Sequence, residues 1–170
     1  MIKDQIGYGL KILFIGINPH PGSDRRGVPF SNNKMFWYLL SDAGLLDESR
    51  EILKDDATLK HIYENDFKNK YKFGLINLVD IPSVTAAEID KTKIIPGRKK
   101  ILHAIKRYKP RVVCFIGKIN FQLFSESSAI SYGWQSEIDQ SKIYVAHAPH
   151  RGPASVRIKE FKEIKRAADT

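Results

Sequence analysis

The chain has 170 residues, a usual length for one domain, and 42% of them are hydrophobic, which is enough to form a buried core. Lys and Arg outnumber Asp and Glu by 28 to 19, and the resulting net charge of +9 favours a polyanionic partner, nucleic acid first and an acidic membrane surface second. The single cysteine excludes an intrachain disulfide, a four-thiolate zinc site and an iron–sulfur cluster.

The N-terminal segment MIKDQIGYGLK has no apolar stretch of the kind found in signal peptides. No run in the chain approaches the ~18 apolar residues that a membrane-spanning helix requires. We therefore expect an intracellular protein without a membrane partner, cytoplasmic and associated with the nucleoid if the source is prokaryotic.

The first predicted element is a strand at residues 11–17, followed by a loop rich in Pro and Gly that ends near residue 30. Apolar residues at helical spacing then predict helices at 32–46 and 56–71. The next elements are a strand at 73–80, a helix at 97–110 and a strand at 111–117. A short helix at 118–126, a fourth strand at 142–146 and a helix at 155–169 complete the order.

The four predicted strands are apolar on both faces, which is typical of parallel strands covered by helices on both sides. Strands that alternate with helices imply right-handed crossover connections. The sequence therefore predicts an α/β fold with three layers, α/β/α, around a central four-stranded parallel sheet, in a single domain of residues 1–170.

Ligands of open parallel sheets bind at the carboxyl ends of the strands. The residues that follow the four predicted strands are polar or basic: Asn18-Pro19, Asp80-Ile81-Pro82, Lys118, and the segment from His147 to Gly152. Because these strand ends meet at one edge of the sheet, we expect their side chains to converge on one site.

Asn18 carries an amide that cannot titrate, but it can hold a water or a substrate edge with two donors and one acceptor. Taken alone, Asn-Pro is more simply a turn starter. Phe30 ends the loop and is able to stack on a planar ring, although a lone loop aromatic more often folds back onto the core. The chemistry of either residue stays open on this evidence alone.

His147 and His150 flank an Ala-Pro pair after the last strand, and a histidine there is able to stabilise a departing anion. No carboxylate or cysteine accompanies the pair, so we expect no metal site. Arg151 precedes the last helix, where backbone N–H groups favour phosphate, and Lys118 begins an earlier helix. Both cations are equally explained as exposed surface charge.

Several separated motifs resemble the uracil-DNA glycosylase superfamily, and specifically its mismatch-specific uracil/thymine-DNA glycosylase branch. They are GINP at 16–19, GVPF at 27–30, FW at 36–37, FGLINLVDIPSVTAAEI at 73–89 and the segment 97–126. The motifs agree with that branch in order and spacing, over roughly residues 10–165. The resemblance implies the fold described above.

The resemblance also implies roles for individual residues. Asn18 matches the asparagine that positions the attacking water, and Phe30 matches the residue on which the extruded base stacks. Asn77 matches an amide that reads the edge of the base in some members. The base contacts of the first motif fall on Gly16, Ile17 and Pro19. Lys118 matches a lysine near the bound DNA.

The last motif departs from the family. Family members have Asn-Pro-Ser or Met-Pro-Ser there, followed by a short wedge of residues that fills the space left in the duplex by the extruded base. Here the chain reads HAPHRGPAS, so Pro149 is kept and His150 replaces the serine. Between the two histidines we prefer His150 as the catalytic group and expect His147 to contact the substrate. The expected DNA contacts of this segment are Arg151, Gly152, Pro153 and Ser155. The wedge has no leucine, so the reading of the opposite base stays open.

The implied activity is hydrolysis of the N-glycosidic bond of uracil, and of thymine or other damaged bases, in mismatches with guanine. Such a monofunctional glycosylase of base-excision repair leaves an abasic site, needs no cofactor or metal, and acts as a monomer on double-stranded DNA. The alternative from another class is a module that binds damaged or single-stranded DNA without chemistry. A hydrolase of free nucleosides is a third reading, which the basic excess disfavours.

Overall fold

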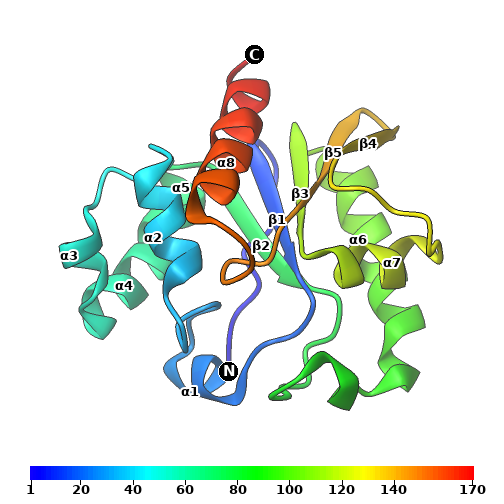
Figure 1. The fold of residues 1–170 in the computed structure, drawn as a ribbon, viewed down its shortest axis with the longest axis horizontal. Helices are drawn as coiled ribbons and strands as arrows, with labels where there is room; N and C mark the ends of the chain where they lie inside the picture. The colour runs from blue at the N-terminus through cyan, green and yellow to red at the C-terminus, as the bar shows by residue number, and fades with distance from the viewer.

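A computed structural model describes residues 1–170, and it has a central five-stranded sheet in the order β2-β1-β3-β5-β4 (Figure 1). The strands are β1 (Ile12–Gly16), β2 (Phe73–Asn77), β3 (Val112–Ile116), β4 (Gly133–Ile138) and β5 (Ser141–Ala146). Strands β2, β1, β3 and β5 are parallel, and β4 runs antiparallel to β5. The predicted α/β class and the four parallel strands are confirmed.

The fifth strand, β4, was not predicted. Its sequence GWQSEI carries polar residues, and its side chains are half-buried or exposed because β4 lies at the edge of the sheet. The apolar runs that identified the buried strands are therefore absent here. The sheet has one more strand than predicted, and that strand lies beyond β5.

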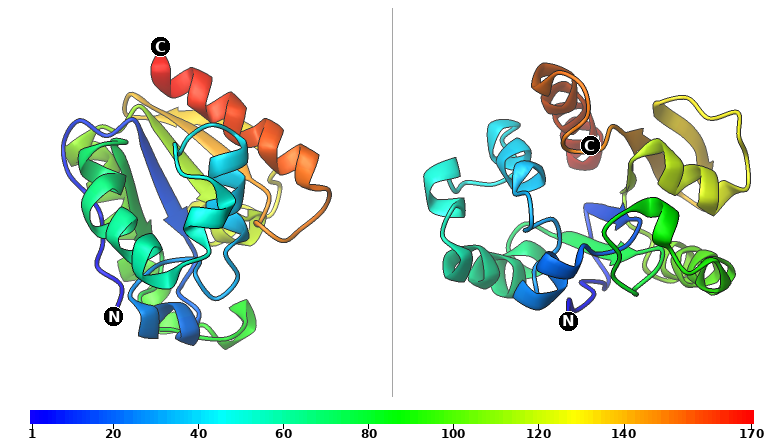
Figure 2. Two further views of the ribbon diagram at one scale, coloured as in Figure 1. Left: turned by 90° about the vertical axis from the view of Figure 1, so that its left-hand side faces the viewer. Right: turned by 60° about the horizontal axis from the view of Figure 1, so that its bottom comes forward.

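Helices cover both faces of the sheet (Figures 1 and 2). On one side lie α2 (Met35–Asp42), α3 (Arg50–Leu53), α4 (Asp56–His61), the π-helical turn η1 (Ile62–Asp66), α5 (Phe67–Asn69) and α8 (Ala154–Asp169). On the other side lie α6 (Ile94–Tyr108) and α7 (Lys118–Ser125). Two 3₁₀ turns, η2 (Ala86–Glu88) and η3 (Lys91–Lys93), lie in the loop before α6.

Alternate residues of each strand enter two different hydrophobic cores. In β1, Ile12 and Phe14 pack with the residues of α2 and α8, whereas Leu13 and Ile15 pack with those of α6 and α7. This alternation follows from the two-residue period of a strand. All five residues of β1 are buried, which explains why the run is apolar on both faces.

The loop after β1 contains a short helix that was not predicted, α1 (Pro21–Arg26). Pro21 stands at its first position, where a missing N–H costs nothing. His20 caps it, because the Nδ1 atom of His20 accepts a hydrogen bond from the N–H of Gly22 over 3.0 Å. The sequence PGSDRR has no apolar periodicity, so these local contacts define the helix rather than a buried stripe.

The four parallel strands end at the same edge of the sheet, shown at the bottom of Figure 1, and the loops that follow them gather there.

None of the helices offers an apolar stretch of the length needed to span a bilayer.

Candidate active site

A cavity of about 650 Å³ opens at the carboxyl edge of the sheet. Residues that follow each of the four parallel strands line it, among them Asn18 after β1, Asn77 at the end of β2, Lys118 after β3 and His150 after β5. No Asp or Glu lines this cavity, whereas Lys118 and Arg151 do. The cavity therefore combines neutral amides with positive charge, which suits a ligand that carries negative charge.

The side chain of Asn18 is fixed by the loop that follows β2. Its Nδ2 group donates to the carbonyl oxygen of Ile81 over 3.1 Å and to the hydroxyl of Ser83 over 2.7 Å. Ser83 is itself held, since its backbone N–H donates to the carbonyl oxygen of Pro19 over 3.1 Å. Both donors of the Asn18 amide are thus engaged, and the atom left for a ligand is the acceptor Oδ1.

Asn77 and Gly16 lie side by side on neighbouring strands. A Cβ atom at position 16 would stand 2.3 Å from Oδ1 of Asn77, so only glycine leaves room for the amide. Asn77 is 5% exposed and lines the cavity, and its side chain makes no hydrogen bond with the rest of the protein. Its amide therefore has one donor group and one acceptor free for a ligand edge.

Phe30 forms part of the cavity wall next to Gly16, whose added Cβ would lie 3.4 Å from Cζ of the ring. The ring of Phe30 stacks on Phe36 of α2, with centroids 4.5 Å apart and an interplanar angle of 28°. Phe30 has a φ of 55°, which is uncommon for a bulky residue and must be held by its surroundings.

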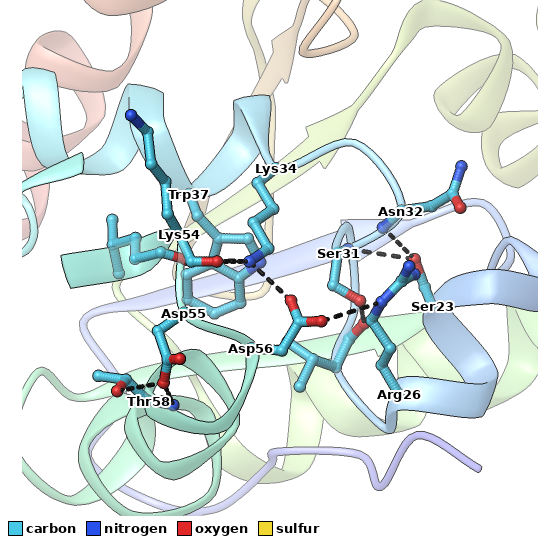
Figure 3. A network of polar contacts seen from close by, with 12 residues as sticks. Ser23, Arg26, Ser31, Asn32, Lys34, Trp37, Lys54, Asp55, Asp56 and Thr58 are labelled. Atoms are coloured by element: carbon cyan, nitrogen blue, oxygen red, sulfur yellow. Dashed lines mark hydrogen bonds and ion pairs between the residues drawn. The ribbon is translucent and has the colours of Figure 1, made fainter. Parts of the chain in front are cut away.

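A network of polar contacts holds the segment that carries Phe30 (Figure 3). The hydroxyl of Ser23, 2% exposed, accepts hydrogen bonds from the N–H groups of Ser31 over 3.1 Å and Asn32 over 3.0 Å. The hydroxyl of Ser31 donates to the carbonyl oxygen of Val28, and Nε1 of Trp37 donates to that of Pro29. These contacts on both sides of position 30 account for its left-handed conformation.

An ion pair extends the same network to α4. Nζ of Lys34 lies 2.7 Å from a carboxylate oxygen of Asp56, and Nε of Arg26 lies 3.6 Å from the other oxygen (Figure 3). The hydrogen bond from Lys34, followed by its charge, lowers the pKa of Asp56 below its ordinary value. Asp56 therefore links the segment after Phe30 to the end of α1.

The segment after β5 divides between the cavity and the surface. His150 and Arg151 line the cavity and are exposed, and neither side chain makes a hydrogen bond to protein. Gly152, Pro153 and Ser155 are exposed outside it. Gly152 has a φ of 71°, which favours glycine at this turn.

His147 lies behind the cavity wall. Its Nδ1 atom is 2.9 Å from Oε2 of Glu160, and its backbone N–H donates to Oε1 of the same carboxylate over 3.0 Å. The ring of Tyr132 stacks on His147 at 3.5 Å with an interplanar angle of 15°, and Tyr132 lines the cavity where His147 does not. Nζ of Lys118 lies 5.3 Å from the Tyr132 ring centroid. Lys118, Tyr132, His147 and Glu160 thus form one continuous column.

Sequence reasoning did not find Tyr132 or Asn120, which both line the cavity. Tyr132 precedes the edge strand β4 in a segment without periodicity, and Asn120 occupies a position in α7 that the sequence does not distinguish from a surface residue. Cys114 plays no part in the cavity, because it is fully buried in β3 and burial raises the pKa of its thiol. No group of three or more His, Cys, Asp or Glu side chains comes together as a metal site.

A family model described as the uracil DNA glycosylase superfamily matches residues 4–168. The chain belongs to this superfamily. The match supports a uracil-DNA glycosylase activity in general, which is hydrolysis of an N-glycosidic bond in DNA. It covers the whole sheet and every residue that lines the cavity.

The uracil DNA glycosylase fold brings most of the expected site residues together. Those that line the cavity are Ile17, Asn18, Pro19, Phe30, Asn77, Lys118, His150 and Arg151. Those that do not line it are Gly16, His147, Gly152, Pro153 and Ser155. Gly16 still lies against the cavity residues Asn77 and Phe30, and His147 contacts the cavity residue Tyr132.

Proposed function

We propose that this protein is a monofunctional DNA glycosylase of the mismatch-specific uracil/thymine branch, acting as a monomer and with residues 1–170 as one catalytic domain. Its substrate is uracil mismatched with guanine in double-stranded DNA, with thymine and other deaminated or damaged bases as further substrates. The observation that carries the proposal is the fixed amide of Asn18, whose only free hydrogen-bonding atom is an acceptor at the cavity.

The cavity has the components needed to hold one base. A base inside a duplex is out of reach of the enzyme, so it has to be extruded, and extrusion costs less from a mismatch. Phe30, supported by Phe36, offers an aromatic face on which the base stacks. Asn77 offers a donor and an acceptor to its polar edge, and the motif at Gly16, Ile17 and Pro19 forms the adjoining wall.

The chemical step follows from the acceptor at position 18. Oδ1 of Asn18 accepts a hydrogen bond from a water and turns the water oxygen toward C1′ of the sugar. The C1′–N bond breaks, its electron pair leaves with the base, and the water oxygen forms the new bond to C1′. An amide cannot take the proton of that water, so the proton passes to the departing base anion or to solvent. We therefore expect slow turnover.

Positive charge on the cavity serves both the DNA and the leaving base. Lys118 and Arg151 both line the cavity, and we propose that they contact the phosphates next to the extruded nucleotide. His150 lines the same wall without a protein partner, so it is free to donate to the base anion. We propose that the exposed turn before α8 enters the duplex; its residues are Arg151, Gly152, Pro153 and Ser155. The contact of His147 with Glu160 joins the end of β5 to α8 and so holds the two elements that this turn connects.

The test is release of uracil from a duplex with one G·U pair, followed by alkali. Strand cleavage after alkali reports the abasic product, and we expect it with the natural protein and not with Asn18→Ala, which should still shift the DNA in a gel. A gel shift by the natural protein without any cleavage would instead indicate a binding module. Duplexes with thymine, hypoxanthine or ethenocytosine opposite each base would then rank the substrates.

A further inference from the structure

One buried cation of the protein has no counter-charge. Arg157, in the first turn of α8, is 7% exposed. Its Nη2 atom donates to the carbonyl oxygen of Gly152 over 2.9 Å, whereas Nε and Nη1 are buried and have no hydrogen-bond partner. The first carboxylate that follows it on α8 is that of Glu160, and this group is engaged by the ring and the backbone N–H of His147. The charge of Arg157 is therefore unpaired.

An arginine is almost never buried unless an anion pairs with it or hydrogen bonds satisfy its donors. Two N–H groups of a charged side chain that are removed from water and lack an acceptor are unfavourable, so such an exception calls for an explanation. The planar guanidinium matches the oxygens of carboxylate and phosphate groups, which it binds with two hydrogen bonds at once. The free donors of Arg157 therefore indicate an anion from outside the chain.

The guanidinium lies directly beneath the turn between β5 and α8, which is orange in Figure 1. Gly152, whose carbonyl oxygen it contacts, is exposed, and so are the residues on either side of it. Within the turn, residues 150–153, this carbonyl is the only group that a side chain holds. A shift of the turn would thus break one side-chain contact and uncover Arg157.

The same shift would complete the donor set of the guanidinium. Each edge that can bind two oxygens of one anion includes Nη2, together with either Nε or Nη1. In the free protein Nη2 is the atom that Gly152 engages, and the other two nitrogens are the ones without a partner. Loss of the contact with Gly152 therefore frees a pair of neighbouring donors.

We propose that Arg157 binds a phosphate of the DNA when the turn before α8 enters the duplex. Movement of the turn breaks the hydrogen bond to Gly152, uncovers the guanidinium and lets the phosphate oxygens accept hydrogen bonds from it. The buried charge gains an anion only in the complex with an extruded base, and so it favours the inserted position of the turn. This inference rests on the proposed function, because it requires that the turn enters the duplex.

The dependence of DNA affinity on salt tests the proposal with two duplexes. One carries 2′-fluoro-deoxyuridine opposite guanine, where the fluorine slows bond cleavage, and the other has cytosine at that position, so that no base is extruded. In Arg157→Met the slope of log affinity against log salt concentration should fall by about one for the uracil duplex. The slope for the ordinary duplex should stay unchanged. Affinity for the uracil duplex should fall about tenfold.

The melting temperature separates this role from that of a structural brace. Methionine replaces a buried charge that has no counter-charge, so the melting temperature of Arg157→Met should stay the same or rise. Arg157→Gln keeps a donor for the carbonyl of Gly152 and removes the charge. It should show the same loss of slope, and it serves as the second variant if the methionine is not accommodated.

The matched control is Arg111→Met. Nη1 of Arg111 donates to the carbonyl oxygen of Ala168 over 2.9 Å, at the other end of α8 and at the opposite edge of the sheet. Arg111 thus also joins a guanidinium to a backbone carbonyl, but far from the turn. This variant should leave the slope unchanged for both duplexes.

An unchanged slope for the uracil duplex in Arg157→Met and Arg157→Gln overturns the proposal. An equal loss of affinity for both duplexes, together with a lower melting temperature, overturns it as well, because Arg157 would then only support the fold. Release of uracil from ordinary G·U duplex by the natural protein is measured in parallel. If release occurs and the slope does not depend on Arg157, only this inference fails; if no release occurs, the proposed function fails and this inference with it.

Discussion

The amide of Asn18 donates to the hydroxyl of Ser83 over 2.7 Å and so joins the end of β1 to the loop that follows β2. The hydroxyl of Ser83 in turn donates to the carbonyl oxygen of Thr85 over 2.9 Å. This chain of contacts sets the direction in which Oδ1 of Asn18 points. If that direction matters for the chemical step, the hydroxyl at position 83 should affect the rate through its hydrogen bond to Asn18.

Replacing Ser83 by Ala should slow excision under single-turnover conditions by about fivefold, as expected for one hydrogen bond of about 1 kcal/mol. DNA affinity should not change, because Ser83 is not among the residues that we propose to contact the DNA. Ser83→Thr keeps the hydroxyl and should restore the rate. A loss of DNA affinity in Ser83→Ala, with the rate constant unaltered, would mean that Ser83 shapes the loop and not the amide.

Phe30 provides the stacking surface in our proposal, and stacking of a base on an aromatic ring contributes about 1–3 kcal/mol. Phe30→Leu keeps an apolar side chain against Phe36 and removes the aromatic face. Its affinity for a duplex with 2′-fluoro-deoxyuridine should fall roughly 5-fold to 100-fold. Its affinity for a duplex with an abasic-site analogue should stay the same, and an equal loss for both duplexes would contradict the stacking role.

Lys118 and Arg151 are proposed to neutralise phosphates, which makes their contribution depend on salt. Replacing either one by Ala should reduce the slope of log affinity against log salt concentration by about one. Lys106, an exposed lysine near the end of α6, lies at the opposite edge of the sheet and provides the control. Lys106→Ala should leave the slope unchanged. A comparable reduction in this variant would show that the contacts with phosphate are not confined to the cavity.

The ion pair of Asp56 with Lys34 predicts a specific dependence of stability on pH. Because the pKa of Asp56 is lowered in the folded state, its contribution is complete above the pKa of an unfolded Asp, about 3.9. That contribution is lost as the pH falls through the lower folded pKa. Asp56→Asn should therefore unfold with a shallower pH dependence below about pH 4 than the natural protein. Asp56 is largely exposed, so high salt should also flatten the curve of the natural protein.

The parallel strands could be predicted because each is buried on both faces and its sequence is apolar throughout. The edge strand β4 and the helix α1 could not, since β4 is half exposed and α1 is held by a cap at His20 and by contacts of Ser23 rather than by an apolar stripe. The partner of β4 is the next strand, β5, across a tight hairpin, and α1 depends on local hydrogen bonds, so neither element needs an apolar pattern in its sequence.

The candidate site shows the same division. Chain order alone placed Asn18 and Lys118 after strands that end at one edge, the family resemblance added Asn77, and the cavity brings the three together. The sequence could not show that the side chain of His147 contacts Glu160, because this contact depends on how α8 packs against the end of β5. The burial of Asn120 likewise comes from tertiary contacts with Ile15, over 105 positions of the sequence.

The most direct measurement is a crystal structure of the protein with uncleaved duplex DNA carrying 2′-fluoro-deoxyuridine opposite guanine. Our account predicts uracil outside the helix and stacked on Phe30, with a water bound to Oδ1 of Asn18 and in line with C1′. A uracil that stays in the helix, or an Asn18 whose Oδ1 faces away from the sugar in the bound state, would contradict it.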